Sequence, residues 1–307
     1  MIELFARSPQ MREAVSLAER VSVTDANVLI TGESGAGKDL LAAFIHSRSK
    51  RAAQPFVKID CATLPGELLE AELFGYERGA FTGAVEARAG RFEAAQHGTI
   101  VLDEIAHLST DAQAKLLRVI ERREFERLGG RKTIKLDARL LALTNVNLDA
   151  AVKAGRFRED LFYRLNVINI RVPPLRERKQ DVTGLIQYFV KQYAAKHARK
   201  VDRISAPALA LLKLYDYPGN ARELANVIER AVIVASGRSI EEDDLPAGLS
   251  AAVAVQRQRE QPPSLAQMEA SYIAEILAAT RGNKTQCARI LGISRKNLYE
   301  KIARYEL

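Results

Sequence analysis

Short apolar runs alternate with longer stretches of helical periodicity between residues 28 and 172. The runs show no alternation of apolar and polar positions, which is typical of strands buried on both faces. Such strands form parallel sheets that helices cover on both sides. The pattern therefore predicts an α/β domain over residues 1–172, with strands at 28–31, 56–59, 100–102, 140–144 and 166–172.

This pattern ends at Pro173 and Pro174. Residues 173–247 carry helical periodicity without strand patterning, and they are predicted to form a small all-helical subdomain. Its helices are expected at 181–196, 206–215 and 220–235. Residues 248–264 are rich in Ala, Gln, Arg and Pro and have no periodic apolar face, which is typical of a linker.

Residues 265–307 are predicted to form three helices with a helix-turn-helix at the end. Ser264 can cap the first helix, Asn283 with a Gln three residues later resembles a capping box, and Ser294 can cap the third helix after Gly292. One face of the first helix contains Leu265, Met268, Tyr272, Ile273, Ile276 and Leu277. The small core is expected to contain Ala288, Ile290, Leu291, Ile293, Leu298 and Ile302.

The basic residues gather at the C-terminal end of a chain whose net charge is +8. Between residues 281 and 305, seven Lys or Arg residues stand against one acid, Glu300. A basic cluster on a small helical domain is typical of nucleic-acid binding. The seven are Arg281, Lys284, Arg289, Arg295, Lys296, Lys301 and Arg304.

The remaining composition is typical of a folded intracellular protein. No apolar run among the 307 residues approaches the ~18 needed to span a bilayer. The N-terminus lacks the apolar stretch of a signal peptide. Cys61 and Cys287 have no metal-binding spacing, and they are expected to stay reduced. These features predict a cytoplasmic protein without a membrane partner.

Residues 32–38 read Gly-Glu-Ser-Gly-Ala-Gly-Lys and fit the phosphate-binding loop pattern G-x-x-x-x-G-K, called the P-loop below. The segment follows a predicted strand and precedes a helical stretch, which is the context that the motif requires. Glycines let backbone N–H groups turn toward phosphate oxygens, the helix N-terminus adds positive potential, and Lys38 adds a full charge. The expected nucleotide-binding residues are Gly32, Glu33, Ser34, Gly35, Ala36, Gly37, Lys38 and Asp39.

The second half of this site is predicted where the strand at 100–102 ends in two acids, Asp103 and Glu104. Asp103 is placed to hold Mg²⁺, directly or through water, and Glu104 to polarise the attacking water. Two acids at a strand end are a weak signal alone, but the upstream P-loop makes the signal strong. Asp39 departs from the P-loop pattern, because it stands where Ser or Thr usually binds Mg²⁺.

Residues 79–84 read Gly-Ala-Phe-Thr-Gly-Ala. This hexapeptide resembles the signature of bacterial enhancer-binding proteins, the NtrC-like AAA+ activators of sigma-54 RNA polymerase. The resemblance covers about residues 5–245, and the C-terminal helices are similar to the Fis-type helix-turn-helix that these proteins carry. Further segments that match in order are 102–105, 155–161, 164–167, 174–178 and 217–224.

The resemblance implies an α/β AAA+ ATPase with a helical lid, which binds ATP and Mg²⁺. Lys38, Asp103 and Glu104 match its ATPase core. Asn145, at the end of the strand at 140–144, matches the sensor that reads the γ-phosphate. Arg222 matches the second sensor, which reaches the nucleotide from the lid.

Arg158 and Arg164 match the arginine fingers of the family. Such an arginine neutralises charge on the transferring phosphoryl group, and its supply by a neighbouring subunit makes hydrolysis depend on ring assembly. From spacing alone, surface salt bridges with Glu159 or Asp160 are the alternative. The implied function is a hexameric ATPase that remodels the sigma-54 RNA polymerase holoenzyme and drives open-complex formation.

The hexapeptide itself allows two interpretations. One is a surface turn whose Phe81 packs into the core. The other is an exposed tip, made mobile by two glycines, that moves with the nucleotide state and presents Phe81 and Thr82 to a partner. The resemblance favours the second, with sigma-54 contacted by Gly79, Ala80, Phe81, Thr82, Gly83 and Ala84. A second projection is expected at 124–137, a hairpin that turns at residues 129–130.

The third C-terminal helix is predicted to enter the DNA major groove, where Arg and Asn make bidentate contacts to bases. The residues expected on or near its exposed face are Arg295, Lys296, Asn297 and Lys301. Lys284 and Arg289 are expected to contact phosphates. Pairing of two copies through residues 265–280 would match a palindromic enhancer site. A basic surface that serves only solubility is the alternative.

Several features depart from the family pattern. Asp60 stands where the family usually has an Asn that restrains the catalytic Glu, and an ionised Asp cannot donate a hydrogen bond. Ala36, Asp39 and Tyr76 are milder departures. Family members commonly carry an N-terminal regulatory domain, whereas here the ATPase begins almost at Met1. Either a separate regulatory protein controls this activator, or the sequence is a fragment.

Two other classes of function compete with this one. A DNA-binding regulator without motor activity is disfavoured by the intact hexapeptide and by Arg158 and Arg164. An AAA+ remodeller of another client protein is disfavoured by the hexapeptide and by the helix-turn-helix.

Overall fold

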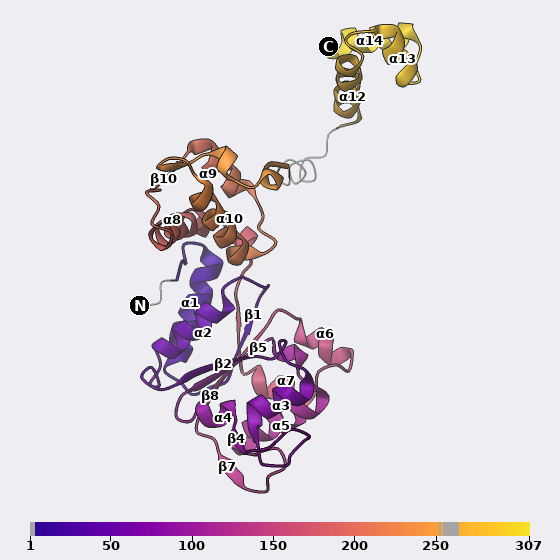
Figure 1. The fold of residues 1–307 in the computed structure, drawn as a ribbon. Helices are drawn as coiled ribbons and strands as arrows, with labels where there is room; N and C mark the ends of the chain where they lie inside the picture. Colours follow the sequence, from indigo (N-terminus) through magenta and orange to yellow (C-terminus); the bar gives the residue numbers. More distant parts are fainter. Residues whose placement is uncertain (1–3, 252, 254–263) are drawn as a thin grey trace. The chain divides into compact units, whose positions relative to one another are not determined.

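The computed structural model describes residues 4–251, 253 and 264–307, and the chain divides into two compact units, Met1–Pro246 and Ala247–Leu307 (Figure 1). The first unit contains a five-stranded parallel sheet with the strand order β2-β5-β8-β1-β9. The predicted parallel α/β architecture is therefore confirmed. The strands are β1 (Val28–Thr31), β2 (Phe56–Asp60), β5 (Thr99–Asp103), β8 (Arg139–Thr144) and β9 (Ile168–Arg171).

The central strands explain the apolar runs, because both of their faces are covered. In β5, Val101 packs into the core on one side of the sheet and Leu102 into the core on the other. The prediction that every strand is buried on both faces is wrong for β2, where Phe56 and Lys58 are exposed, and for β9, where Asn169 and Arg171 are exposed. The reason is that β2 and β9 lie at the two edges of the sheet.

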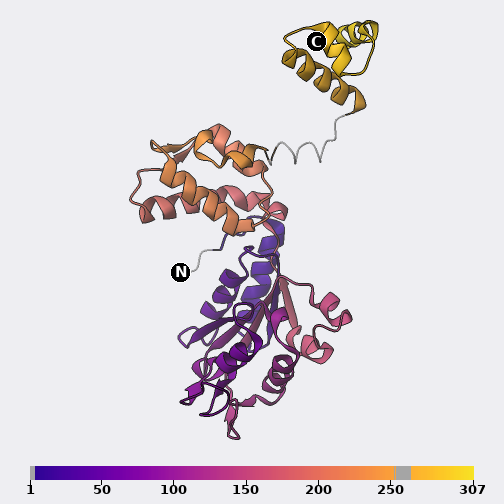
Figure 2. The same cartoon turned by 45° about the vertical axis from the view of Figure 1, so that its right-hand side comes forward.

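Helices cover both faces of the sheet (Figures 1 and 2). The cluster on one face includes α1 (Pro9–Ser22) and α2 (Lys38–Ser47). The other face carries α3 (Gly66–Phe74), α4 (Arg91–Ala94), η1 (Ile105–His107), α5 (Thr110–Arg122), α6 (Leu148–Lys153) and α7 (Glu159–Leu165). This arrangement leaves the carboxyl ends of the parallel strands at one edge, where ligands bind in open α/β sheets.

Two antiparallel hairpins extend from this unit. One pairs β3 (Gly75–Tyr76) with β4 (Arg88–Ala89), and the other pairs β6 (Glu124–Glu126) with β7 (Thr133–Lys135). The second is the hairpin predicted at 124–137. The two lie side by side, since the N–H of Leu128 donates to the carbonyl oxygen of Gly75 at 2.9 Å.

The helical subdomain contains α8 (Lys179–Lys196), α9 (Ala206–Leu214) and α10 (Asn220–Val234), with short helices η2 (Leu175–Glu177) and η3 (Glu242–Asp244). The all-helical prediction misses a parallel pair, β10 (Arg203–Ile204) and β11 (Ser239–Ile240). Strands of two residues are too short to show a period of two in the sequence. Asp181 of α8 accepts hydrogen bonds from Ser8, which caps α1, and thereby joins the subdomain to the α/β part.

The second unit contains α12 (Leu265–Ala279), α13 (Lys284–Ile290) and α14 (Arg295–Tyr305), capped by Ser264, Asn283 and Ser294 as predicted. Its buried core is Ile273, Cys287, Ala288 and Leu298. Ile290 is exposed, contrary to prediction, and the buried Cys287 was missed. The predicted face of α12 is buried only toward its C-terminal half, since Leu265, Met268 and Tyr272 are exposed.

The linker predicted at 248–264 falls mostly on residues 252 and 254–263, which lie outside the described residues. Residues 248–251 are helical rather than irregular. Among the helices described, none combines the length and the apolar character that crossing a bilayer requires.

Candidate nucleotide site and contact surfaces

The P-loop leads into a helix whose N-terminus has no side-chain cap. Helix α2 begins at Lys38, and its N-cap is Gly37, with φ of +104°. By contrast, Ser8, Ser109 and Asn147 cap α1, α5 and α6 through their own side chains. The first N–H groups of α2 therefore remain for an anion, which is how helix N-termini bind phosphate.

Lys38 lies at the centre of the predicted nucleotide site. Its buried Nζ donates hydrogen bonds to the carbonyl oxygens of Gly32, at 2.8 Å, and Glu33, at 3.3 Å. The same Nζ lies 3.6 Å from Oε1 of Glu104. The ammonium group thus stands between the P-loop backbone and the acidic end of β5.

Glu104 follows β5 in a left-handed backbone conformation, with φ of +52°. For a residue other than glycine this conformation costs about 1–3 kcal/mol, and such strain clusters at functional sites. Oε2 of Glu104 accepts a hydrogen bond from the backbone N–H of Asn145 at 3.1 Å. Lys38, Glu104 and Asn145, which the sequence places in three separate segments, therefore lie together.

Asp103, the predicted Mg²⁺ ligand, pairs with a residue that the sequence analysis missed. Nζ of Lys58 lies 2.8 Å from Oδ2 of Asp103 and 2.5 Å from Oδ1 of Asp39. Burial lowers the pKa of Lys58, but its hydrogen bonds to Asp103 and Asp39 outweigh that effect and raise the pKa above the usual value. The two carboxylates share one ammonium group.

The groups at this position fit Mg²⁺. This ion prefers oxygen ligands and is usually held by one or two carboxylates together with water and substrate phosphates. Asp39 and Asp103 supply two carboxylates, and the ammonium group of Lys58 pairs with both of them. In the described part of the chain, no group of three or more His, Cys, Asp or Glu residues could hold a metal by itself. Phosphate oxygens would therefore complete the site.

The helical subdomain contacts the P-loop through a polar network. Nη1 of Arg222 donates to Oγ of Ser34 at 2.9 Å. The carboxylate of Glu33 accepts from both Nη atoms of Arg176, at 2.8 and 2.6 Å, and from Nδ2 of Asn220 at 3.1 Å. These hydrogen bonds from Arg176 and Asn220 lower the pKa of Glu33 to about 2.

Close backbone contacts strengthen this connection. A Cβ added at Gly35 would lie 2.4 Å from the carbonyl oxygen of Gly219, so only glycine allows the approach. The buried Arg178 donates to the carbonyl oxygen of Ala36 at 2.6 Å. Because of these contacts, a movement of the lid would act directly on the P-loop. Except for Arg222, the lid residues of this network were missed by the sequence analysis.

Arg158 and Arg164 lie at the two ends of α7. Arg158 forms a two-pronged ion pair with Asp160, at 3.0 and 2.7 Å, and Nε of Arg164 lies 3.1 Å from Oε1 of Glu121. The side chains of the two arginines are 40% and 62% exposed. Within the described residues, no hydrogen bond or ion pair joins either arginine to the P-loop of its own chain.

The loop of residues 79–84 connects β3 and β4. The N–H of Gly79 donates to the carbonyl oxygen of Ala84 at 2.8 Å, and Gly79 and Gly83 have φ values of +82° and +104°. Ala84, which was predicted to contact sigma-54, is buried. The ring of Phe81 packs edge-on to Tyr76, at 4.9 Å between centroids, yet Phe81 remains 39% exposed. Thr82 is exposed. The interpretation of Phe81 as a core residue is therefore wrong.

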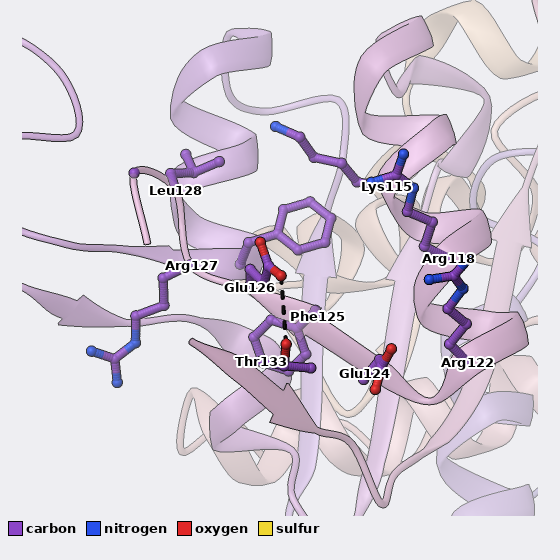
Figure 3. Close-up of a pocket in the computed structure, with 11 residues that line it drawn as sticks. Lys115, Arg118, Arg122, Glu124, Phe125, Glu126, Arg127, Leu128 and Thr133 are labelled. Carbon is purple, nitrogen blue, oxygen red and sulfur yellow. Dashed lines mark hydrogen bonds between the residues drawn. The ribbon is translucent and has the colours of Figure 1, made fainter. Parts of the chain in front are cut away.

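The β6–β7 hairpin lies against this loop and borders a pocket of about 270 Å³ (Figure 3). The guanidinium of Arg127 pairs with Glu93, at 2.9 and 2.8 Å, and with Glu77 at 3.2 Å. A Cβ added at Gly129 would lie 2.9 Å from Cβ of Ala80. The side chains that α5 contributes to the pocket are Lys115, Arg118 and Arg122.

Known families match successive parts of this chain. Residues 4–171 match the sigma-54 interaction domain, residues 176–262 match the AAA+ ATPase lid domain, and residues 264–305 match the Fis family of bacterial regulatory proteins. The chain belongs to the sigma-54-dependent transcriptional activators. Its fold class is that of an AAA+ α/β domain with a helical lid and a Fis-type helix-turn-helix.

Individual members of the family are similar over nearly the whole chain. The regulatory protein AtoC of Escherichia coli is 46% identical over 310 residues, which covers 98% of this chain and 67% of AtoC. The transcriptional regulatory protein FlbD of Caulobacter vibrioides is 44% identical over 98% of this chain and 70% of its own length. The crystal structure of NtrX from Brucella abortus with ADP is 35% identical, with a TM-score of 0.75 over 100% of this chain and 70% of NtrX.

The Fis-type domain of this activator exposes the N-terminal turn of α14, which carries Arg295, Lys296 and Asn297. Arg289 is also exposed, and Nζ of Lys284 lies 4.7 Å from the ring centroid of Tyr299. Lys301 differs from expectation, because its Nζ pairs with Glu269 of α12 at 2.6 Å and its side chain is only 22% exposed. It holds α14 to α12 instead of projecting from the exposed face.

Asp60, which the resemblance to the family aligns with a usual Asn, follows the pattern expected of an ionised carboxylate and accepts a hydrogen bond. Its Oδ1 accepts from the N–H of Ala62 at 2.9 Å, and no hydrogen bond joins it to Glu104 within the described residues. The neighbouring Cys61 is buried, and burial raises the pKa of its thiol to about 12. The N–H of Cys61 donates to the carbonyl oxygen of Asp103 at 2.9 Å, which links the two strand ends.

Proposed function

We propose that the chain binds enhancer DNA, assembles into a hexameric ring and hydrolyses ATP to remodel the sigma-54 RNA polymerase holoenzyme until promoter DNA opens. The observation that carries this proposal is the path from the nucleotide site to the exposed loop. Cys61 is hydrogen-bonded to Asp103, and α3 runs from there to β3 and the loop of residues 79–84. A displacement at the acidic end of β5 can therefore reach Phe81 and Thr82 through one helix.

In the proposed mechanism, Lys38 and the first N–H groups of α2 hold the phosphates of ATP. ATP as the substrate is supported by the similar NtrX, which was solved with ATP and with ADP. Glu104 takes the proton of the attacking water, and Asn145 aligns that water and the γ-phosphate. Mg²⁺ held by Asp103, with Asp39 beside it, would neutralise charge on the β- and γ-phosphates.

The remaining contacts of the nucleotide come from the lid and from a neighbouring protomer. Arg222 reaches it from the lid, where its hydrogen bond to Ser34 already places it beside the P-loop. Arg158 and Arg164 are supplied by a neighbouring protomer, which makes ring assembly a condition of turnover. Before ATP is in place, Glu104 is restrained by the N–H of Asn145 and by Lys38, since Asp60 cannot donate the hydrogen bond of an Asn.

Replacing Thr82 with alanine tests the contact-loop function. The ATPase rate is expected to stay near that of the wild type, because Thr82 is exposed and no hydrogen bond joins it to the P-loop within the described residues. Open-complex formation at a sigma-54 promoter is expected to fall about tenfold or more, as after loss of one central interface contact. The control Thr82→Ser keeps the hydroxyl and should keep most of the activity. Normal open-complex formation by Thr82→Ala would refute the function given to this loop.

Arg295 and Arg289 separate base contacts from phosphate contacts. Arg295→Ala is expected to weaken binding to the enhancer site by about 1–3 kcal/mol and to relax sequence preference, without changing ATP hydrolysis. Arg289→Ala should weaken binding to all DNA similarly and lower the slope of log K against log salt by about 1. Titrations of cognate and unrelated duplexes at several salt concentrations measure both effects. Equal losses on both duplexes for Arg295→Ala would exclude its contact with a base.

A further inference from the structure

Lys58 occupies a particular place relative to the acids of the nucleotide site. In the β2–β5 pairing, Lys58 lies opposite Val101 and Asp60 opposite Asp103, so these four residues share one face of the sheet. The side chain of Lys58 extends toward the carboxyl ends of the strands, where its Nζ meets Asp103 at 2.8 Å. The same atom meets Asp39, at the second position of α2, at 2.5 Å.

The contacts of Lys38 show why the position of Lys58 matters. Lys38 lies next to Glu104 and to two P-loop carbonyl oxygens, and no ion pair within the described residues joins it to Asp39 or Asp103. Lys58 alone neutralises that pair of carboxylates in the described part of the chain. Without it, two like charges from different elements would repel each other beside two further acids, Asp60 and Glu104.

We propose that Lys58 is a built-in counter-cation that keeps divalent ions out of the Asp39–Asp103 pair until nucleotide arrives. The proposal rests on the function proposed above, and it adds an order to that function: the metal enters with the nucleotide and not before it. Lys58 is a positioning residue in this scheme, because it acts through the two carboxylates.

The balance of charges explains the order. A divalent ion that arrives alone must displace an ammonium group already paired with both carboxylates, and Mg²⁺ gives up its water reluctantly. The phosphates of a nucleotide bring additional negative charge and further oxygen ligands. The metal and the ammonium group can then both be neutralised, because the site holds more anionic groups than the two carboxylates. Lys58 can move without a change of the backbone, since its side chain is 38% exposed on an edge strand.

Binding of Mn²⁺ to the nucleotide-free full chain tests the proposal, because free Mn²⁺ gives a paramagnetic resonance signal that disappears on binding. Lys58→Gln is expected to bind Mn²⁺ at least about tenfold more tightly than the wild type. The substitution removes the ammonium charge that competes with the metal, and the interaction free energy of two charges at this distance exceeds the free energy of a tenfold change in affinity. Lys58→Arg should bind as weakly as the wild type, and so should Lys153→Gln, a change at an exposed lysine of α6. Equal affinity of the wild type and Lys58→Gln would overturn the proposal.

A double variant tests whether the gained Mn²⁺ affinity belongs to the Asp39–Asp103 pair. Asp39→Asn with Lys58→Gln removes one negative and one positive charge, so the local net charge is that of the wild type. It should bind Mn²⁺ no more tightly than the wild type, because only Asp103 of the pair remains. Tight binding by this double variant would contradict the assignment of the site to Asp39 and Asp103.

Binding of ADP, measured in parallel, separates this proposal from the function on which it rests. If neither the wild type nor any variant binds ADP, but Lys58→Gln gains Mn²⁺ affinity, the ATPase proposal fails and the role of Lys58 stands. If the wild type binds ADP normally and Lys58→Gln shows no gain in Mn²⁺ affinity, the role of Lys58 fails and the ATPase proposal stands.

Discussion

Replacing Arg158 or Arg164 with alanine is expected to lower kcat for ATP hydrolysis by ~10³–10⁵, the range measured when arginine fingers are removed from other phosphoryl-transfer enzymes. Nucleotide binding by the isolated chain should change little, because neither arginine contacts the P-loop of its own chain within the described residues. Both guanidinium groups are instead exposed at the ends of α7, where they pair with Asp160 and Glu121. Steady-state ATPase assays above the assembly concentration measure the effect. Lys153→Ala, at an exposed lysine of α6, is the control.

A mixing experiment shows whether these arginines act between subunits. Arg158→Ala subunits retain Glu104, and Glu104→Gln subunits retain both arginines. Mixed rings therefore contain interfaces with all groups intact, and the mixture should hydrolyse ATP faster than the sum of the two separate proteins. A mixture no faster than that sum would contradict supply of Arg158 by a neighbour.

Glu104→Gln is expected to have the second-largest effect, a loss of about 10²–10⁴ in kcat, which is the usual contribution of general base catalysis. Glutamine has nearly the same size and can still accept the hydrogen bond from the N–H of Asn145, but it cannot take a proton from water. Binding of a fluorescent ATP analogue should therefore persist. In Lys38→Ala, by contrast, binding itself should be lost. Turnover at the wild-type rate in Glu104→Gln would remove the catalytic assignment.

The sequence predicts the parts of the nucleotide site that lie in contiguous motifs. The P-loop and the acids after β5 need only a strand, a turn and a helix in order, and the structure brings Lys38 close to Glu104 as the motifs imply. Lys58 was missed because β2 read as a buried strand. Whether a strand lies at the centre or the edge of a sheet depends on pairing between distant segments, which local periodicity does not contain.

The contacts between lid and P-loop were missed for a related reason. Glu33 meets Arg176 and Asn220 across separations of 143 and 187 residues. Neither lid residue differs in type from an ordinary surface residue, so nothing local marks it as a partner of the P-loop. The segments at 174–178 and 217–224 that resemble the activator family contain both lid residues, but the resemblance assigned a role only to Arg222 and not to this network.

In helix α12, the apolar periodicity predicts more burial than the structure shows. Six apolar residues fall on one predicted face, yet the small three-helix core covers only its C-terminal half, and Leu265, Met268 and Tyr272 remain exposed. The proposed pairing of two copies through residues 265–280 is consistent with this exposure, and it stays a prediction.

The central claim is that phosphate chemistry at the P-loop moves the loop of residues 79–84 against sigma-54. Size-exclusion chromatography of the purified chain with sigma-54 tests it most directly, with no nucleotide, with ADP, and with ADP plus aluminium fluoride as a mimic of the transferring phosphoryl group. A co-eluting complex is expected only with the mimic, and it should be absent for Thr82→Ala. Failure of the wild type to associate with sigma-54 under every one of these conditions would contradict the claim.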